Sequence, residues 1–224
     1  MKQLGFRSGN WLSAEQSSEV LKHACGDSMR AKRDYAMLAM LFGCGFRRSE
    51  LVGLELDEIQ MRQGHWAAVD LVGEGGHIRT VPIPDWVKAS LDQWTAAARV
   101  SEGRIFRAVA RTGKVWGKRL SQNVVWYVVK SCCERAGLEH IAPHDLRRTC
   151  AKLCHSNGGE LEQIQFLLGH ASVQTTGEVW AGWAFDGTVL PTARLLARPS
   201  LWRNGNNRSV ESSRCSSRNN DFQG

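Results

Sequence analysis

Apolar residues recur at helical spacing in several stretches of the chain. Between Lys32 and Phe42, helical spacing places one set of apolar side chains on the same face of a helix: Tyr35, Leu38, Ala39 and Phe42. Ser13, followed three residues later by Gln16, matches the capping box that begins a helix. The same spacing and capping signals predict further helices over residues 47–54, 84–94, 121–136, 144–156 and 161–168.

Two short stretches carry a β pattern instead. Residues 66–72 and 77–83 are rich in β-formers, and the glycine-rich turn at 73–76 joins them into a predicted hairpin. The expected fold class is therefore α+β, mostly α-helical, with a small antiparallel β-sheet inserted after the first helical block. After Thr176 the periodicity fades, and the last residues are rich in Ser, Asn, Arg and Gly, so we expect a largely disordered tail over 177–224.

Length and charge narrow the classes of function. A chain of 224 residues that is 42% hydrophobic can bury the core of one large domain. Its net charge of +7 favours a polyanionic partner such as nucleic acid, although a slightly basic surface would also account for it. Because no apolar run approaches the ~20 residues of a membrane span, and no signal-type region follows the N-terminus, we expect a cytoplasmic protein with no membrane partner.

The cysteines and tryptophans are interpreted as core residues. Cys150, Cys154 and His155 lie close in sequence, but no second ligand pair follows at zinc-site spacing, so we expect no metal. The seven scattered cysteines are better interpreted as reduced, mostly buried thiols. The tryptophans that stand among apolar neighbours are expected in the core rather than on a base-stacking surface: Trp66, Trp86, Trp94, Trp116 and Trp126.

One group of polar residues carries candidate chemistry. His144, Arg147 and Arg148 stand together in one predicted helix, and His170 follows the next helix. A guanidinium group grips a phosphate with two parallel hydrogen bonds, and histidine exchanges protons near neutral pH. These residue types suit an enzyme that holds a phosphodiester and moves protons at it.

Three blocks along the chain resemble the catalytic domain of the tyrosine recombinases, the phage integrase family. Their order and spacing make the joint match specific, and it covers roughly Trp11 to Thr176. The resemblance implies a catalytic domain over residues 1–176, with the family's N-terminal core-binding domain expected to be absent, and an aberrant tail over 177–224. The blocks are Gly-Cys-Gly-Phe-Arg-Arg-Ser-Glu-Leu at 43–51, the hairpin at 72–84, and Pro-His-Asp-Leu-Arg-Arg-Thr at 143–149 continuing through Leu-Leu-Gly-His-Ala-Ser-Val-Gln-Thr-Thr at 167–176.

The resemblance also implies roles for single residues. Arg47 and Arg147 would clamp the non-bridging oxygens of the scissile phosphate, and His144 would transfer protons or donate hydrogen bonds beside them. His170 would hydrogen-bond the phosphate, and Glu50 would support the fold of the site. The family transfers a DNA phosphate to a tyrosine, giving a 3′-phosphotyrosyl link that strand exchange reverses. No metal, ATP or other cofactor is implied.

The implied partner is double-stranded DNA, with phosphate contacts carrying most of the affinity. We expect Arg47, Arg147, Arg148 and Arg79 to contact it. The family assembles as a tetramer on DNA, in which a C-terminal helix often docks on a neighbouring protomer. The altered tail puts that homo-oligomer in doubt for this chain.

Two positions depart from the family pattern. Glu74 stands where the family has a hairpin lysine that protonates the leaving 5′ oxygen, and Val179 stands where it has the nucleophilic tyrosine. The chain has two tyrosines, Tyr35 and Tyr127, and both fall in apolar helical stripes that indicate core or interface positions. The abrupt end of the match after Thr176 is typical of a reading-frame change, so we expect a decayed integrase gene.

These observations rank three functions. The leading interpretation is the catalytic domain of a site-specific DNA recombinase or integrase that is inactive as written. The alternative is a non-catalytic DNA-binding protein that occupies recombination sites or modulates an intact recombinase. A metal-dependent nuclease is disfavoured because no carboxylate cluster accompanies the histidines.

Overall fold

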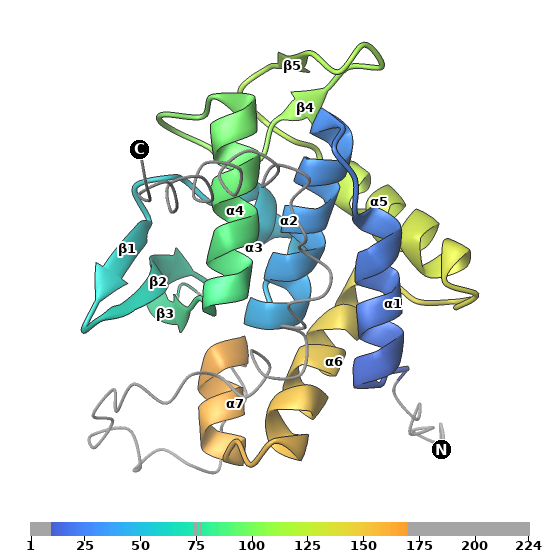
Figure 1. The fold of residues 1–224 in the computed structure, drawn as a ribbon. Helices are drawn as coiled ribbons and strands as arrows, with labels where there is room; N and C mark the ends of the chain where they lie inside the picture. Colours follow the sequence, from blue (N-terminus) through green and yellow to red (C-terminus); the bar gives the residue numbers. More distant parts are fainter. Residues whose placement is uncertain (1–9, 74–75, 77, 170–224) are drawn as a thin grey trace, which may run out of the picture.

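The computed structural model of the chain describes residues 10–73, 76 and 78–169. Over this part the fold is the predicted one, mostly helical with a small antiparallel sheet (Figure 1). The elements are, in chain order, α1 (Ala14–Ala24), α2 (Met29–Cys44), α3 (Arg48–Gly53), β1 (Ile59–Arg62), β2 (His65–Val72), β3 (Ile78–Pro82), α4 (Asp85–Ala98), β4 (Ala108–Val109), β5 (Val115–Trp116), α5 (Gln122–Arg135), α6 (Pro143–Ser156) and α7 (Leu161–Leu168).

Helix α2 forms the centre of the molecule. Every residue from Tyr35 to Cys44 is buried, and α1, α4, α5 and α6 pack around this helix (Figure 1). The sequence suggested one apolar face, but a helix covered by others on all sides buries its whole circumference. The helix passes through Gly43 and ends at Cys44, where Gly45 adopts the left-handed conformation that terminates many helices.

The predicted hairpin is confirmed as β2 and β3, and β1 adds a third antiparallel strand beside β2. Strand β1 was not predicted: its sequence, Ile-Gln-Met-Arg, alternates apolar and polar residues, but over four residues only. Residues 105–117, for which the sequence predicted no strand, contain the short hairpin of β4 and β5.

A bulge in β2 decides which side chains of the sheet face the helices. Ala68 pairs with Val81, yet Leu71, three positions later, pairs with Arg79, so β2 holds one extra residue, and Asp70 there has a positive φ of 56°. The extra residue keeps both Ala68 and Leu71 in the core. Without it, Leu71 would point to the opposite face, because side chains alternate along a strand.

The interpretation of the tryptophans is correct for three and wrong for two. Trp94 is fully buried and donates a hydrogen bond to the Ile105 carbonyl at 3.0 Å, while Trp66 and Trp86 pack partly buried against the core. Trp116 and Trp126 are 61% and 38% exposed. The apolar stripe of α5 faces the core, which leaves Trp126 on the outer side of that helix.

The two tyrosines, predicted at core or interface positions, differ in burial, and the cysteines fit their prediction. Tyr35 is a core residue, whereas Tyr127 is exposed and meets the Trp126 ring edge-on. Five of the six described cysteines are buried, and all six are free thiols.

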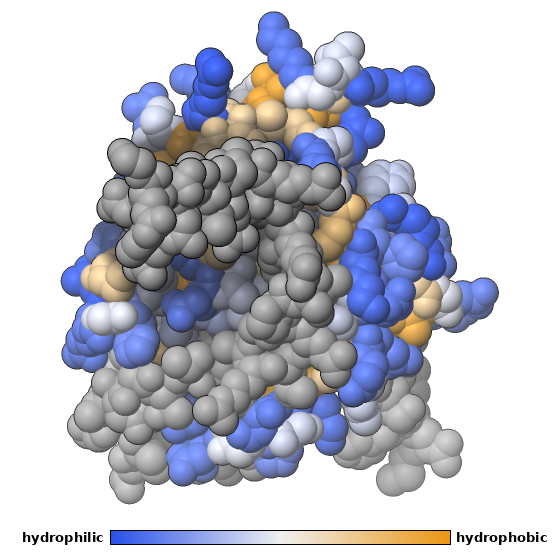
Figure 2. All heavy atoms as spheres, in the orientation of Figure 1, coloured by the Kyte–Doolittle hydropathy of each residue, from blue (hydrophilic) through white to orange (hydrophobic). Residues whose placement is uncertain are grey.

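In the view of Figure 2 the described surface is mostly hydrophilic, with apolar residues in small groups. None of the described helices combines the length and apolar character needed to cross a membrane.

Candidate functional site

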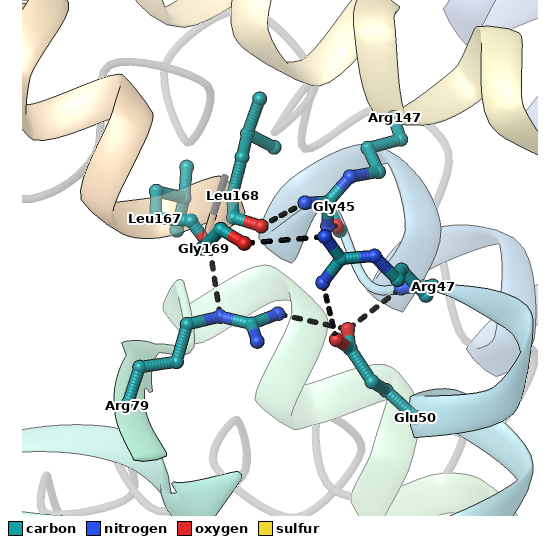
Figure 3. Close-up of polar contacts among 8 residues, drawn as sticks. All are labelled: Gly45, Arg47, Glu50, Arg79, Arg147, Leu167, Leu168 and Gly169. Carbon is teal, nitrogen blue, oxygen red and sulfur yellow. Dashed lines mark hydrogen bonds and ion pairs between the residues drawn. The ribbon is translucent and has the colours of Figure 1, made fainter. Parts of the chain in front are cut away.

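Three arginines from distant parts of the chain meet at the C-terminal end of α7 (Figure 3). Arg47 immediately precedes α3, Arg79 lies on β3, and Arg147 lies in α6. Each donates to a main-chain carbonyl group at this helix end, where carbonyl groups lack partners within the helix and carry partial negative charge, and Arg147 also donates to a carbonyl group at the end of α2. The acceptors are the carbonyl oxygens of Gly45 and Leu168 for Arg147, of Leu167 for Arg79, and of Gly169 for Arg47.

Glu50 joins two of these arginines. One of its carboxylate oxygens accepts from Arg47 Nη1, and the other accepts from both Arg79 Nη2 and the Arg47 main-chain N–H, each at 2.8 Å. Burial alone would raise the pKa of Glu50, but the hydrogen bonds and positive charges of Arg79 and Arg47 outweigh it and hold the pKa below its ordinary value. The carboxylate is therefore ionised at neutral pH and orients both guanidinium groups.

The cluster is both buried and positively charged. Arg147 is 2% exposed, and the Glu50 and Arg79 side chains are each 5% exposed, whereas Arg47 opens partly to the surface. Burial, together with the nearby charge of Arg47, lowers the pKa of Arg147 to about 10, which leaves it protonated at neutral pH. The described side chains of the cluster are three guanidinium groups and one carboxylate, a composition that favours an anionic ligand.

Two glycines allow the elements to approach this closely. Gly45 has a φ of 63°, and a Cβ there would lie 2.9 Å from Leu168 Cδ2. Gly169 caps α7 with a φ of 55°, and a Cβ there would lie 2.9 Å from both Cδ and Nη1 of Arg79. Any other residue would be strained in its backbone, and its Cβ would have to displace the side chain of Leu168 or of Arg79. In the sequence, Gly45 is one residue of the block at 43–51, and nothing there reveals this packing role.

His144 and Arg148 lie at the start of α6 and are exposed. Pro143 begins the helix, and Asp145 accepts hydrogen bonds from the Ala142 N–H and from Arg148. Partial burial lowers the pKa of His144, and the positive charges of Arg148, Arg147 and Arg47 lower it further. The imidazole is therefore within the electrostatic field of the arginine cluster and is neutral at pH 7.

Some predicted site residues lie outside the described residues. His170, the position after Gly169, is one of them, as are Glu74 at the hairpin turn and Val179. Their roles stay predictions. Among the residues that the structure does describe, His, Cys, Asp and Glu form no group of three or more that could hold a metal ion.

Sequence comparison places the chain among known recombinases. The profile of the Phage integrase family matches residues 10–181. Tyrosine recombinase XerC of Azotobacter vinelandii is 35% identical over 168 residues, which are 74% of this chain and 53% of that protein. Tyrosine recombinase XerD of Proteus mirabilis is 33% identical over 169 residues, 74% of this chain and 52% of that protein. The chain thus spans about half the length of these relatives.

Solved structures share the fold. The crystal structure of XerA recombinase superposes with a TM-score of 0.59 at 23% identity, covering 73% of this chain and 55% of that one. The XerH site-specific recombinase, bound to palindromic difH substrate in a post-cleavage complex, gives a TM-score of 0.62 at 21% identity, covering 77% of this chain and 49% of that one. These similarities confirm the predicted fold of a tyrosine-recombinase catalytic domain.

Proposed function

Because this chain belongs to the phage integrase family, we propose that its arginine cluster holds a phosphate of duplex DNA. The observation that carries the proposal is the convergence of Arg47 and Arg147 on one point, with Glu50 orienting Arg47. A phosphate oxygen is a stronger acceptor for a guanidinium group than a main-chain carbonyl oxygen. Two relatives of known structure support DNA as the partner, since XerH was solved with its difH substrate and a lambda integrase dimer with its core site.

We propose further that the chain binds DNA without cutting it. In the family reaction, the tyrosine oxygen bonds to phosphorus as the bond to the 5′ oxygen breaks, and a lysine gives that oxygen its proton. Valine at position 179 offers no nucleophilic atom, and an ionised Glu74 would repel the phosphate and donate no proton. The proposed function is therefore DNA binding by a site-specific recombinase catalytic domain that forms no covalent intermediate.

Binding to a short duplex tests this proposal. We expect fluorescence anisotropy to show binding that weakens steeply with salt, because neutralised phosphates release counterions. Arg47→Ala combined with Arg147→Ala should weaken binding by about tenfold or more and reduce the salt slope by about one per lost contact. Arg47→Ala alone is the milder variant, since Arg47 is the least buried of the three arginines.

The matched control removes the same charge elsewhere. Arg62 ends β1 and Arg111 lies in the turn between β4 and β5, and both are exposed. If Arg62→Ala with Arg111→Ala weakened binding as much as the double site variant, the cluster would not be the phosphate site. Denaturing gels of the same duplex should show no nick and no protein–DNA adduct. Either product would contradict the proposal that the chain binds DNA without cutting it.

The departures at positions 74 and 179 favour a second candidate function, which is occupation of recombination sites beside an intact recombinase. Such a protein would lower the yield of an intact relative by competing for the duplex. In a recombination assay, inhibition by this chain that Arg47→Ala relieves would support this function. Assembly with further copies of itself on DNA stays a prediction.

DNA affinity is expected to rise as the pH falls through the region below 7. Partial burial and then the positive charges of the arginines lower the pKa of His144 in the free protein, and a bound phosphate would offset the arginine charge and raise that pKa. Between the lower free value and the higher bound value, binding takes up a proton, so affinity increases until the pH passes the free value. Titrations from pH 8 to 5 should show this slope, and His144→Gln should remove it. His140→Gln, at an exposed histidine, is the control that should leave it unchanged.

A further inference from the structure

Arg79 occupies a position in the sheet where a charged residue is unexpected. In β3 its neighbour Ile78 is exposed, while Arg79 faces inward like Val81, two positions along the strand. Its register partner is Leu71, a core residue. Burying a guanidinium group costs several kcal/mol, on the order of the penalty for any buried ion, unless its charge and hydrogen bonds are compensated. The contacts of Arg79 therefore account for its place in the fold.

Those contacts all lead to the phosphate-binding cluster. Arg79 Nη2 donates to Glu50 at 2.8 Å, and Nε donates to the Leu167 carbonyl at 3.3 Å. The guanidinium group lies directly against the backbone of Gly169, where a Cβ would come within 2.9–3.0 Å of Cδ, Nη1 and Cζ. Nη1 is buried and has no hydrogen-bond partner among the described residues.

Four residues form a closed circuit through three elements. Arg79 binds Glu50, Glu50 binds Arg47, Arg47 Nη2 donates to the Gly169 carbonyl at 3.1 Å, and Gly169 packs on Arg79 (Figure 3). The circuit links β3, α3 and the end of α7. Because each residue limits the freedom of the next, a change at Arg79 reaches Arg47 without any direct contact between the two.

We propose that Arg79 is a positioning residue for the phosphate site, acting through Glu50 on Arg47 and through Gly169 on the end of α7. The inference rests on the proposed function, in which Arg47 contacts the phosphate. It replaces the expectation that Arg79 itself contacts DNA, because Glu50 offsets the charge of Arg79 and takes its Nη2 donor, while the Leu167 carbonyl takes its Nε donor. A structural ion pair would stabilise the fold and leave Arg47 where it is, so the two roles differ in a measurable way.

A double-mutant cycle on duplex binding separates these roles. Arg79→Met keeps side-chain length without charge, and it should weaken binding by about tenfold in the wild-type background. In the Arg47→Ala background the same change should have a clearly smaller effect, because the route through Glu50 to Arg47 is gone and only the route through Gly169 to the end of α7 remains. Arg79→Lys restores the charge facing Glu50 but not the flat contact with Gly169, and an intermediate affinity is expected. Arg111→Met is the control for loss of one charge.

A second readout decides the proposal without DNA. In NMR spectra of arginine side chains, the Arg47 guanidinium signals should be sharp in the wild type and broadened in Arg79→Met, at a temperature where both proteins are folded. Unchanged Arg47 signals in Arg79→Met would overturn the inference. Equal losses of affinity with and without Arg47 would overturn it too, in favour of direct contact. If Arg47→Ala left duplex binding intact, the proposed function would fail. The NMR comparison would still test whether Arg79 positions Arg47.

Discussion

Glu50→Gln is expected to lower the free energy of unfolding by about 3 kcal/mol at pH 7, because removing one partner of a buried ion pair leaves the other charge uncompensated. Arg79 is the residue left in that state, since its other described bond is to a main-chain carbonyl. Urea denaturation followed by circular dichroism measures the loss. Glu134→Gln is the matched control, since that carboxylate is well exposed, lies 3.8 Å from Lys130, and should contribute less than about 1 kcal/mol.

The difference in unfolding free energy between the wild type and Glu50→Gln is expected to depend on pH. The pKa of Glu50 is lowered in the folded protein, so its contribution to stability is present above the ordinary carboxylate pKa of about 4.3 and is lost as the pH falls through the lower folded value. The difference between wild type and Glu50→Gln should therefore be constant from pH 5 to 7 and shrink at more acidic pH. A difference that persisted unchanged into strong acid would show that packing, rather than charge, is its origin.

Gly45→Ala is expected to cost about 3 kcal/mol. The left-handed backbone accounts for about 1 kcal/mol of this, and the rest comes from forcing Leu168 away from the new Cβ. Gly117→Ala separates the two causes, because Gly117 has a similar φ of 70° with no atom within 4 Å of a Cβ. It should therefore lose only the backbone part. Equal losses at the two glycines would mean that α7 yields to the new methyl group without resistance.

Gly45→Ala should also weaken the phosphate site. The Gly45 carbonyl accepts from Arg147, and Leu168, which the methyl group would displace, provides the second acceptor of that arginine. A shift of α7 would move both ends of this contact. Duplex binding should therefore fall for Gly45→Ala and remain normal for Gly117→Ala, measured where both variants are folded.

Local patterns were sufficient wherever one segment determines its own structure. The predicted helices and the β2–β3 hairpin are present near their expected ends, since spacing, caps and turn glycines act over a few residues. Errors arose where burial depends on distant neighbours. Trp126 stands among the valines of α5, yet the packing of the other elements leaves it at the surface, and Trp116 is exposed as well, near Lys118 and Arg119. The alternation in strand β1 spans four residues only, and its pairing with β2 defines it as a strand.

In the candidate site too, the sequence indicated the residues within local motifs but not the contacts between distant elements. Motif spacing indicated Arg47, Arg147 and His144, because these residues carry the family resemblance in recognisable blocks. It did not indicate that Arg79 pairs with Glu50, since 29 residues separate them and each lies on a different element. From residue type alone, Ile78 is expected in the core and Arg79 at the surface, the reverse of what the structure shows. The sequence also shows no sign of the carbonyl group that accepts from Arg79.

By itself, the sequence determined the fold class, the family and the chemistry available at three arginines and a histidine, because residue type and local spacing are properties of the chain. Only the tertiary structure decided that the arginines converge on the end of α7, that Glu50 links Arg79 to Arg47, and that Gly45 and Gly169 must lack side chains. These are contacts between elements whose ends are brought together by burial of a common core, and no local pattern encodes a distance of that kind.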